Sequence, residues 1–505
     1  MIQIIDNLLN RVTMYRLVLY YLISLLVAAV LLSFAHVLAY DPYAMLFSTA
    51  FILAACAVTN YVFSRGFNIA ANVESTYISA LILALIISPI SGYGDLWFLF
   101  WASVLTIASK YIINIRGKHM FNPVAFGVTL TYLTINQSAS WWIGNPTMLP
   151  IVLLGGLLVT RKIRRFKLVW SFMAAAVVAT LLGALFSGQG LGKAVGTLFL
   201  YSPFFFFAFI MLTEPLTTPP TNGLRNLYGA LVGVLFTPAF HFGSFYTTPE
   251  LALVIGNVFS YLVSPKNRLV LHLKAKRQIA PNAFEFVFAP DQRMAFAPGQ
   301  YMEWTLGHEE PDSRGNRRYF TLASAPTEPN LRLGVRFNDP SSTYKQAMLE
   351  MDQGDEIIAG QLSGDFTLPR HPKRPLVFIA GGIGVTPFRS MIKYLLDSHK
   401  HRPVTLFYGN RTVKDIVYKD VFDQAERELG IHTIYIVEDT AGMPSRWRGL
   451  VGLISPRIIQ TYAPNYRDSI FYISGPIVMV DAVKHMLHNM GIPDSQIKTD
   501  FFAGL

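Results

Sequence analysis

Residues 317–326 read RRYFTLASAP, and the rest of this 505-residue chain can be organised around them. A bound flavin needs a cation for its diphosphate, a flat side chain against its ring and a hydroxyl near the reactive N5. The stretch supplies an arginine, a phenylalanine and a threonine in that order, and alternation along a strand would place the first two on one face. By itself it reads equally well as an edge strand with two solvated arginines. The flavin contacts predicted here are Arg318, Tyr319, Phe320, Thr321 and Ser324.

Composition divides the chain into two parts. The first 265 residues consist mainly of long apolar runs, whereas the remainder has the mixed composition of a soluble protein. The net charge of +11 does not indicate nucleic-acid binding, because many of the cations lie between apolar runs and act there as topology signals. Cys56 is the only cysteine, so disulfides within the chain and iron–sulfur clusters held by several thiolates are excluded.

Ten apolar runs in the first part are candidate transmembrane helices, since a hydrocarbon core about 30 Å thick needs about 20 apolar residues per helix. Lysines and arginines fall almost entirely in alternate connecting segments, which predicts a cytoplasmic N-terminus and a cytoplasmic C-terminal part. We expect no cleavable signal peptide, because no small-residue cleavage site follows the first run. Five spans in each half would allow an inverted repeat. The approximate limits are 17–39, 44–63, 73–90, 96–113, 121–135, 147–160, 168–186, 195–212, 227–242 and 250–264.

Two acids and three histidines stand out among these runs. Glu74 and Glu214 lie near predicted cytoplasmic ends, where an acid either serves a buried site or caps a helix end in interfacial water. His36, His119 and His241 also lie near span ends. Their spacing does not indicate a transmembrane haem, and no metal site is predicted.

Residues 121–123 read FNP, residues 213–221 read TEPLTTPPT, and a basic turn occupies 160–167. Among ten apolar runs, these segments resemble the NqrB/RnfD family of membrane flavoprotein subunits from sodium-pumping and Rnf redox complexes. The resemblance implies a redox-active membrane domain with electron-transport partner subunits. That family carries FMN esterified to a threonine of a Ser-Gly-Ala-Thr type motif in the loop after the fifth span. Here that loop, at about 136–145, reads NQSASWWIGN, so covalent FMN is not expected, and Thr147 is merely the nearest threonine.

From residue 267 short alternating strands separate turns rich in Pro, Gly and Asn. They predict a small antiparallel β-barrel that ends near Pro369. Within it, Ser342 and Thr343 precede a helix through Met351, and their hydroxyls with the free backbone N–H groups would suit a phosphate. A plain N-cap explains the same pair. The expected strands lie near 269–273, 284–288, 300–306, 319–324 and 331–337.

After Pro375 buried strands alternate with helices, which predicts an open parallel sheet that binds ligand beyond the carboxyl ends of its strands. The first strand leads into GGIGVTP at 381–387, where Thr386 should be the N-cap of a helix and Pro387 its first residue. Glycines that end at a helix N-terminus predict a pyrophosphate site. The dinucleotide contacts predicted here and after two later strands are Gly381, Gly382, Gly384, Thr386, Pro387, Asn410, Arg411, Gly475 and Pro476.

The motifs RYFT at 318–321, GGIGVTP at 381–387, SGP at 474–476 and DFFAGL at 500–505 occur in the order of the ferredoxin–NADP reductase superfamily, which residues 267–505 resemble. The resemblance implies FAD and NAD(P)H as cofactors and catalytic roles for three residues where flavin and nicotinamide meet. Phe320 replaces the usual tyrosine and Ser474 the usual cysteine, and both keep the steric fit that hydride transfer needs. The implied catalytic residues are Thr321, Ser474 and Phe502, in a chain divided into a transmembrane domain at 1–265, an FAD domain at 266–370 and an NAD(P) domain at 371–505.

These features predict a multi-pass NAD(P)H dehydrogenase in the lipid bilayer of a bacterial inner membrane. Hydride would pass to FAD, and electrons would continue to a quinone or to a non-covalent flavin in the helical part. NADH is slightly favoured, because only Arg411 and Lys414, with Asp415 adjacent, follow the second strand of the sheet, and exposed loop cations are commonly solvated. An ion transporter that is driven by redox chemistry or senses nucleotide, and a subunit of a larger electron-transport complex, are the alternatives.

Overall fold

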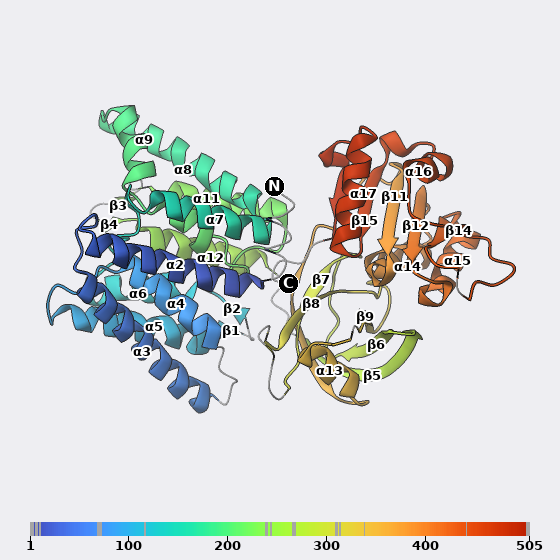
Figure 1. Ribbon diagram of the computed structural model, residues 1–505, viewed down its shortest axis with the longest axis horizontal. Coiled ribbons are helices and arrows are strands. Elements are labelled where there is room, and N and C mark those ends of the chain that lie inside the picture. Colours follow the sequence, from blue (N-terminus) through green and yellow to red (C-terminus); the bar gives the residue numbers. More distant parts are fainter. Residues whose placement is uncertain are drawn as a thin grey trace. The chain divides into compact units, whose positions relative to one another are not determined.

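The computed structural model describes residues 5, 9, 12–67, 73–115, 118–237, 241–242, 245–264, 269–308, 312, 315–337, 339–440 and 442–500. The chain divides into two compact units, Met1–Lys266 with Ala503–Leu505, and Asn267–Phe502 (Figure 1). Phe502 and the side chains of His119 and His241 lie outside the described part.

The first unit is helical, and each predicted apolar run is helical over most of its length, although the run 195–212 is divided among three helical segments. Its helices are α2 (Met14–Phe34), α3 (Pro42–Gly66), α4 (Val73–Ile86), α5 (Asp95–Ile112), α6 (Pro123–Ile135), α7 (Leu149–Ile163), α8 (Phe166–Ser187), α9 (Leu191–Leu200), α10 (Phe204–Phe206), the π-helical η1 (Phe207–Met211), α11 (Asn222–Phe236) and α12 (Pro249–Val263). Two short antiparallel pairs, β1 (Asn114–Ile115) with β2 (Lys118–His119) and β3 (His241–Phe242) with β4 (Phe245–Tyr246), lie between helices.

Three described helices, α2, α3 and α8, are long and apolar enough to cross a membrane. The pair formed by α9 and the segment Phe204–Met211 would make a fourth, although it is bent by 58° at its break. Ser202 and Pro203 lie at that break, where proline removes a backbone donor. The apolar helices α4 and α6 have 14 and 13 residues, so each measures about 20 Å, less than the hydrocarbon thickness. The structure supports three or four spans, and the count of ten stays a prediction.

The second unit starts with an antiparallel sheet of six strands in the order β8-β7-β10-β5-β6-β9. After β8, the Ala323 N–H donates to the Arg332 carbonyl on β9, so the sheet curls back toward its other edge. No strand ladder joins these two edges within the described residues, so a closed barrel is not shown. The strands are β5 (Leu269–Ala280), β6 (Ala283–Pro290), β7 (Tyr301–Thr305), β8 (Arg317–Thr321), β9 (Leu331–Arg336) and β10 (Glu356–Ser363), with α13 (Thr343–Glu350) before β10.

A parallel sheet follows, as the alternation of strands and helices predicts, in the order β14-β13-β12-β11-β15-β16. Every residue of β11 is buried, because α14 and α15 cover one face of the sheet and α16 and α17 the other. The elements are β11 (Leu376–Gly381), α14 (Thr386–Asp397), β12 (Val404–Asn410), α15 (Lys419–Leu429), β13 (His432–Val437), β14 (Leu450–Val451), α16 (Pro456–Tyr462), β15 (Ile470–Ser474), α17 (Ile477–Asn489) and β16 (Ile497–Thr499).

Candidate functional site

Strand β8 carries the predicted flavin contacts on two faces. Arg318 and Phe320 share one face, as alternation requires, and both lie against Tyr344 of α13. The Arg318 guanidinium carbon is 5.0 Å from the centre of that ring. On the other face, the Tyr319 hydroxyl donates to Glu303 Oε2 at 2.9 Å. The strand therefore presents a cation with an aromatic ring on one face and a hydroxyl on the other.

Arg318 and the start of α13 come together through Asp312. Arg318 is buried, bonds to Asp312 Oδ1 at 3.2 Å and donates to the Gly315 carbonyl at 2.9 Å. Thr343 Oγ1 accepts from the Asp312 backbone N–H at 2.9 Å, and Ser342 is the N-cap whose hydroxyl accepts from the helix. The residues fit a diphosphate in charge and hydroxyl content, but a phosphate bound here would replace Asp312 as the partner of Arg318.

The glycine loop is shaped as a binding turn, with one correction to its predicted helix start. A 3₁₀ turn, Gly382–Val385, follows β11, so Val385 is the N-cap and Thr386 the first helical residue, one position earlier than expected. A Cβ on Gly384 would lie 2.6 Å from the Cα of Gly475, so backbone touches backbone there. Only glycine fits this approach. The contact brings together the two loops predicted to hold the dinucleotide.

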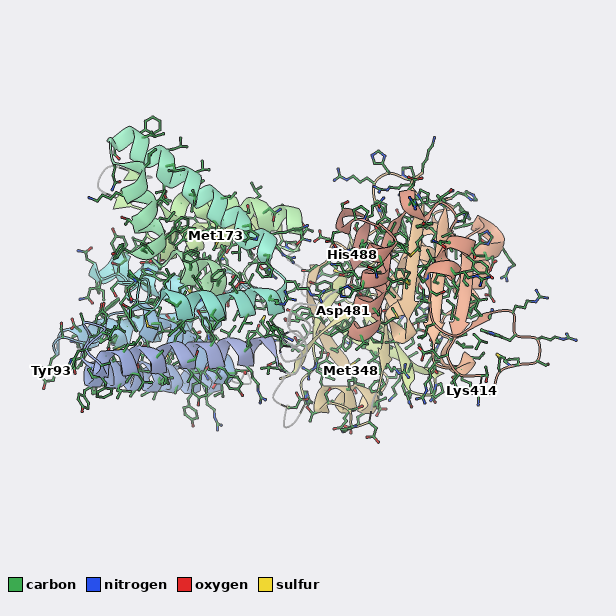
Figure 2. All side chains as sticks on the ribbon, turned by 45° about the horizontal axis from the view of Figure 1, so that its top comes forward. Tyr93, Met173, Met348, Lys414, Asp481 and His488 are labelled. Carbon is green, nitrogen blue, oxygen red and sulfur yellow. The ribbon has the colours of Figure 1, made fainter. Side chains whose placement is uncertain are left out.

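At the carboxyl end of β12, Asn410 is buried, and neither of its amide atoms has a hydrogen-bond partner in the described part of the chain. A buried amide without partners is costly, so a polar ligand at this edge would satisfy it. Arg411 follows and is exposed. Asp415, which the sequence left free to pair with a neighbouring cation, caps its own turn by accepting from Thr412 N–H at 3.0 Å. Lys414 lies exposed at the surface of this unit (Figure 2).

Two acids at this edge were missed by the sequence reasoning. Glu438 and Asp439 follow β13, and their backbone N–H groups donate to the carbonyls of Asn410 and Arg411 at 3.1 and 2.8 Å. Their location could have been predicted from the sequence, because the carboxyl ends of neighbouring parallel strands meet at one edge of a sheet. Their backbones lie next to those of Asn410 and Arg411, and both acidic side chains are exposed at this edge.

Thr321 and Ser474 meet at one carboxylate. Asp500 Oδ2 accepts from Thr321 Oγ1 and from Ser474 Oγ, each at 3.3 Å. Thr321 and Ser474 are 6% and 4% exposed, whereas Asp500 is only partly buried. They come from β8, from the end of β15 and from the segment after β16. The structure thus joins two of the three predicted catalytic residues and adds Asp500, whose only sequence signal was its place at the start of the terminal motif.

The first unit contains a polar cluster around Glu214. Asn122 Nδ2 donates to Glu214 Oε2 at 2.9 Å, and the Thr217 hydroxyl donates to the same atom at 3.1 Å. The Asn122 backbone N–H donates to Asn257 Oδ1 at 2.8 Å, and Asn257 Nδ2 donates to the Tyr228 hydroxyl at 3.2 Å. Burial raises the pKa of Glu214 to about 7. The motifs FNP and TEP therefore meet, and Glu214 is part of a network rather than a lone helix cap.

The second unit is an NAD(P)H-dependent flavin oxidoreductase domain. It combines an antiparallel sheet that carries the RYFT strand with a parallel sheet that carries the glycine loop. A family model described as the oxidoreductase NAD-binding domain matches residues 378–485.

Among curated relatives, the chain is similar to the reductase subunit of the glycine betaine monooxygenase of Pseudomonas aeruginosa, at 24% identity over 43% of this chain and 60% of the relative. It is also similar to one subunit of the Na⁺-translocating NADH-quinone reductase of Haemophilus influenzae, at 30% identity over 37% and 48%. The chain thus spans about half the length of these relatives. A solved cytochrome P450 reductase of Amycolatopsis aligns with 24% identity and a TM-score of 0.42 over 47% of this chain and 70% of its own.

Proposed function

We propose that this chain is a membrane-bound NAD(P)H dehydrogenase that passes electrons from its second unit to an acceptor held by its helical unit. The observation that carries the proposal is the meeting of Thr321 and Ser474 at Asp500, in a chain that also has three or four apolar helices of membrane length. FAD, when bound, supplies hydride acceptance and one-electron release.

Different residues of the site would bind the dinucleotide and orient the reacting groups. Backbone N–H groups at the start of α14 suit the dinucleotide pyrophosphate. The hydroxyls of Thr321 and Ser474 donate to Asp500, which fixes the orientation of both hydroxyls. Asp500 also offers a place to hold a proton at the flavin edge. Together these groups orient the nicotinamide and exclude water from the transfer step.

A quinone is the acceptor that we favour, and a non-covalent flavin in the helical unit is the second candidate. A lipid-embedded unit gives access to a quinone, and one curated relative belongs to an NADH-quinone reductase. The cluster around Glu214 offers amide and hydroxyl donors and a carboxyl of raised pKa, with Lys110 close enough to interact with it electrostatically. These are the groups that a quinone needs for hydrogen bonding and for protonation on reduction. The resemblance of FNP and TEPLTTPPT to NqrB/RnfD membrane flavoproteins favours a redox role for the helical unit and fits the second candidate, a membrane-held flavin.

The test uses the full-length protein purified in detergent. We expect one releasable FAD per chain, NADH oxidation with ferricyanide, and NADH oxidation with a water-soluble ubiquinone. Arg318→Ala should lower flavin occupancy, because a charge-assisted bond to a diphosphate contributes about 1.5–3 kcal/mol. Flavin that stays on the denatured polypeptide would contradict the non-covalent assignment. Protein without flavin would favour a subunit that is inactive alone, and ion flux without NAD(P)H would favour a transporter.

A further inference from the structure

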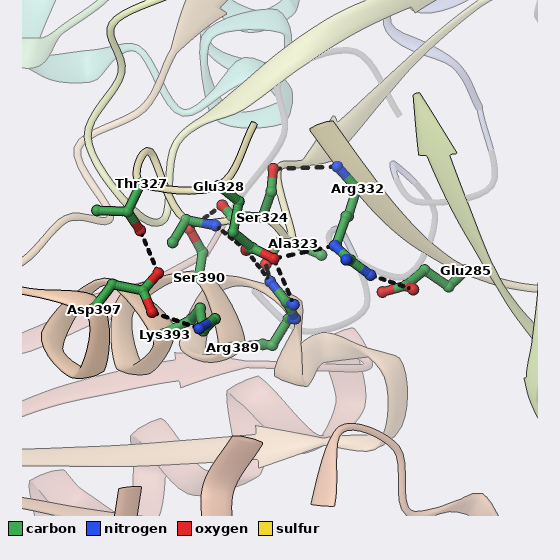
Figure 3. A network of polar contacts seen from close by, with 11 residues as sticks. Glu285, Ala323, Ser324, Thr327, Glu328, Arg332, Arg389, Ser390, Lys393 and Asp397 are labelled. Atoms are coloured by element: carbon green, nitrogen blue, oxygen red, sulfur yellow. Dashed lines mark hydrogen bonds and ion pairs between the residues drawn. The ribbon is translucent and has the colours of Figure 1, made fainter. Parts of the chain in front are cut away.

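The helix that follows the glycine loop also holds the backbone that follows the flavin strand (Figure 3). Arg389 Nη1 of α14 donates to the Ala323 carbonyl at 2.8 Å. The next residue, Ser390, donates from Oγ to the Ser324 carbonyl at 2.6 Å. Both side chains are buried. One helix therefore joins the segment after β8 to the loop that the proposed function assigns to the dinucleotide.

A carboxylate fixes the orientation of Arg389. Arg389 Nη2 donates to Glu328 Oε1 at 3.0 Å while Nη1 donates to Oε2, which is a bidentate pair. Glu328 Oε2 also accepts from the Ala325 backbone N–H at 2.7 Å. Burial raises the pKa of Glu328, but the hydrogen bonds and charge of Arg389 outweigh it and hold that pKa below its ordinary value. The pair is therefore ionised at neutral pH.

A second arginine holds the same carboxylate from the antiparallel sheet. Arg332 of β9 pairs through Nε with Glu328 Oε1 at 3.1 Å and through Nη1 with Glu285 Oε2 at 2.8 Å. Its backbone N–H donates to Ser324 Oγ at 3.1 Å. Residues 323–328 are thus fixed by β9 on one side and by α14 on the other (Figure 3). Such charged networks fix geometry more reliably than they add stability.

The path from one proposed cofactor site to the other is short and stiff. Arg389 lies three residues after Thr386, which is about 4.5 Å along a helix. Ala323 lies two residues after Thr321 in a backbone that is bonded on both sides. A shift of α14 would therefore be passed to the hydroxyl of Thr321 with little loss.

We propose that Arg389 is a positioning residue for hydride transfer, which fixes the flavin-side backbone relative to the N-terminus of the dinucleotide helix. This rests on the proposed function and deepens it. Reacting atoms must approach to about 3–3.5 Å, and a misplacement of about 1 Å costs up to about 100-fold in rate. A lysine would keep the charge, but its single ammonium cannot contact both Glu328 oxygens and the Ala323 carbonyl in one planar geometry.

The test compares full-length Arg389→Lys and Arg389→Met with the control Lys393→Met. Lys393 lies one turn further along the same helix and is half-buried. It pairs with Asp397, which accepts from Thr327 Oγ1 at 2.6 Å, so the control perturbs the outer edge of the same segment without touching Arg389 or Glu328. In stopped-flow mixing with NADH, both Arg389 variants should retain FAD and bind NAD⁺ within about threefold of wild type, while flavin reduction slows by about 10- to 100-fold. The charge-transfer absorbance of the reduced flavin with NAD⁺ should weaken in parallel. Lys393→Met should match the wild type.

Arg389→Lys is the decisive variant for the positioning role, because it keeps the buried charge paired and should keep the fold. Flavin reduction at the wild-type rate in that variant, with FAD bound, would overturn the proposal. If Arg389→Met loses FAD, the double variant Arg389→Met with Glu328→Gln removes the unpaired carboxylate, and a wild-type rate there would overturn it as well. A wild-type protein that does not reduce its flavin with NADH would refute the proposed function instead.

Discussion

The two units fix their irregular segments with different chemistry. In the helical unit, Glu214 is bonded by an amide and a hydroxyl, Asn122 and Thr217, at the breaks between apolar helices. In the second unit, Glu328 is bonded by two arginines where two sheets meet. Burial penalises the charge of Glu214 more than the nearby cation Lys110 offsets it, whereas two arginines at a polar junction keep Glu328 paired in one geometry. The first arrangement leaves its carboxyl able to take a proton, and the second keeps its carboxyl ionised.

We expect the largest effect on quinone reduction from removal of the helical unit. Deleting residues 1–266 should leave a soluble protein, because Asn267–Phe502 is a compact unit by itself. Ferricyanide reduction with NADH should stay within about threefold of the full chain, while ubiquinone reduction is lost. Steady-state assays of both proteins measure this. A fragment that reduces ubiquinone as fast as the full chain would make the helical unit an anchor.

Asp500→Asn tests the second unit alone, because it changes the carboxylate that accepts from Thr321 and Ser474 and leaves the helical unit intact. The amide keeps the shape but cannot accept from Thr321 and Ser474 in the same way, nor hold a proton. We expect kcat with ferricyanide to fall by about 100-fold with KM for NADH nearly unchanged. Asp494→Asn, an exposed acid that pairs with Lys484, is the control and should have no effect. Equal losses in both variants would remove Asp500 from the site.

Glu214→Gln tests the helical unit alone, because it changes the buried carboxyl of the polar cluster and leaves the second unit intact. The glutamine can still accept from Asn122 and Thr217, but it carries no exchangeable carboxyl proton. Ubiquinone reduction should fall by about tenfold and ferricyanide reduction should not change. In the wild type, ubiquinone reduction should decline as the pH rises through about 7, where Glu214 loses its proton. An unchanged pH profile in Glu214→Gln would exclude this carboxyl as the proton donor.

Nucleotide choice is a smaller effect at the edge of the parallel sheet. Because Glu438 and Asp439 lie beside Arg411, NADH should be preferred over NADPH by up to about tenfold in kcat/KM, or about 1.4 kcal/mol. The double variant Glu438→Gln with Asp439→Asn should narrow that preference. A preference for NADPH that collapses in Arg411→Ala would reverse the assignment.

The smallest effect is the pH dependence of stability at the Glu328 pair. The pKa of Glu328 is below its ordinary value of 4.5 in the folded protein. The pair therefore contributes stability above that value, and the contribution is lost as the pH falls through the lower, folded pKa. Thermal unfolding of the second unit should show Tm falling more steeply below about pH 4.5 in wild type than in Glu328→Gln. Parallel curves would mean that the pair is not coupled to folding.

Much of the second unit could be predicted from local sequence. Alternation placed Arg318 and Phe320 on one face of a strand, and strand–helix alternation indicated the parallel sheet. The helical unit was less predictable, because apolar composition marks helices without setting their length. Runs of similar hydropathy became α8, with 22 residues, and α6, with 13. Only the folded chain shows which runs reach the length of a membrane span.

The local elements and the order of the motifs follow from the amino-acid sequence, because strand alternation, glycine turns and helix caps depend on neighbouring residues. Tertiary structure alone decided which side chains from distant segments meet. Asp500 bonds to Thr321, 179 positions away, and Arg389 bonds to Ala323, 66 positions away. Asp312 pairs with Arg318, and Asp415, besides capping its own turn, pairs with Arg336 of β9. These long-range pairings depend on how strands and helices pack across the chain, whereas a pair such as Lys393 with Asp397, four residues apart on one helix, follows from local spacing.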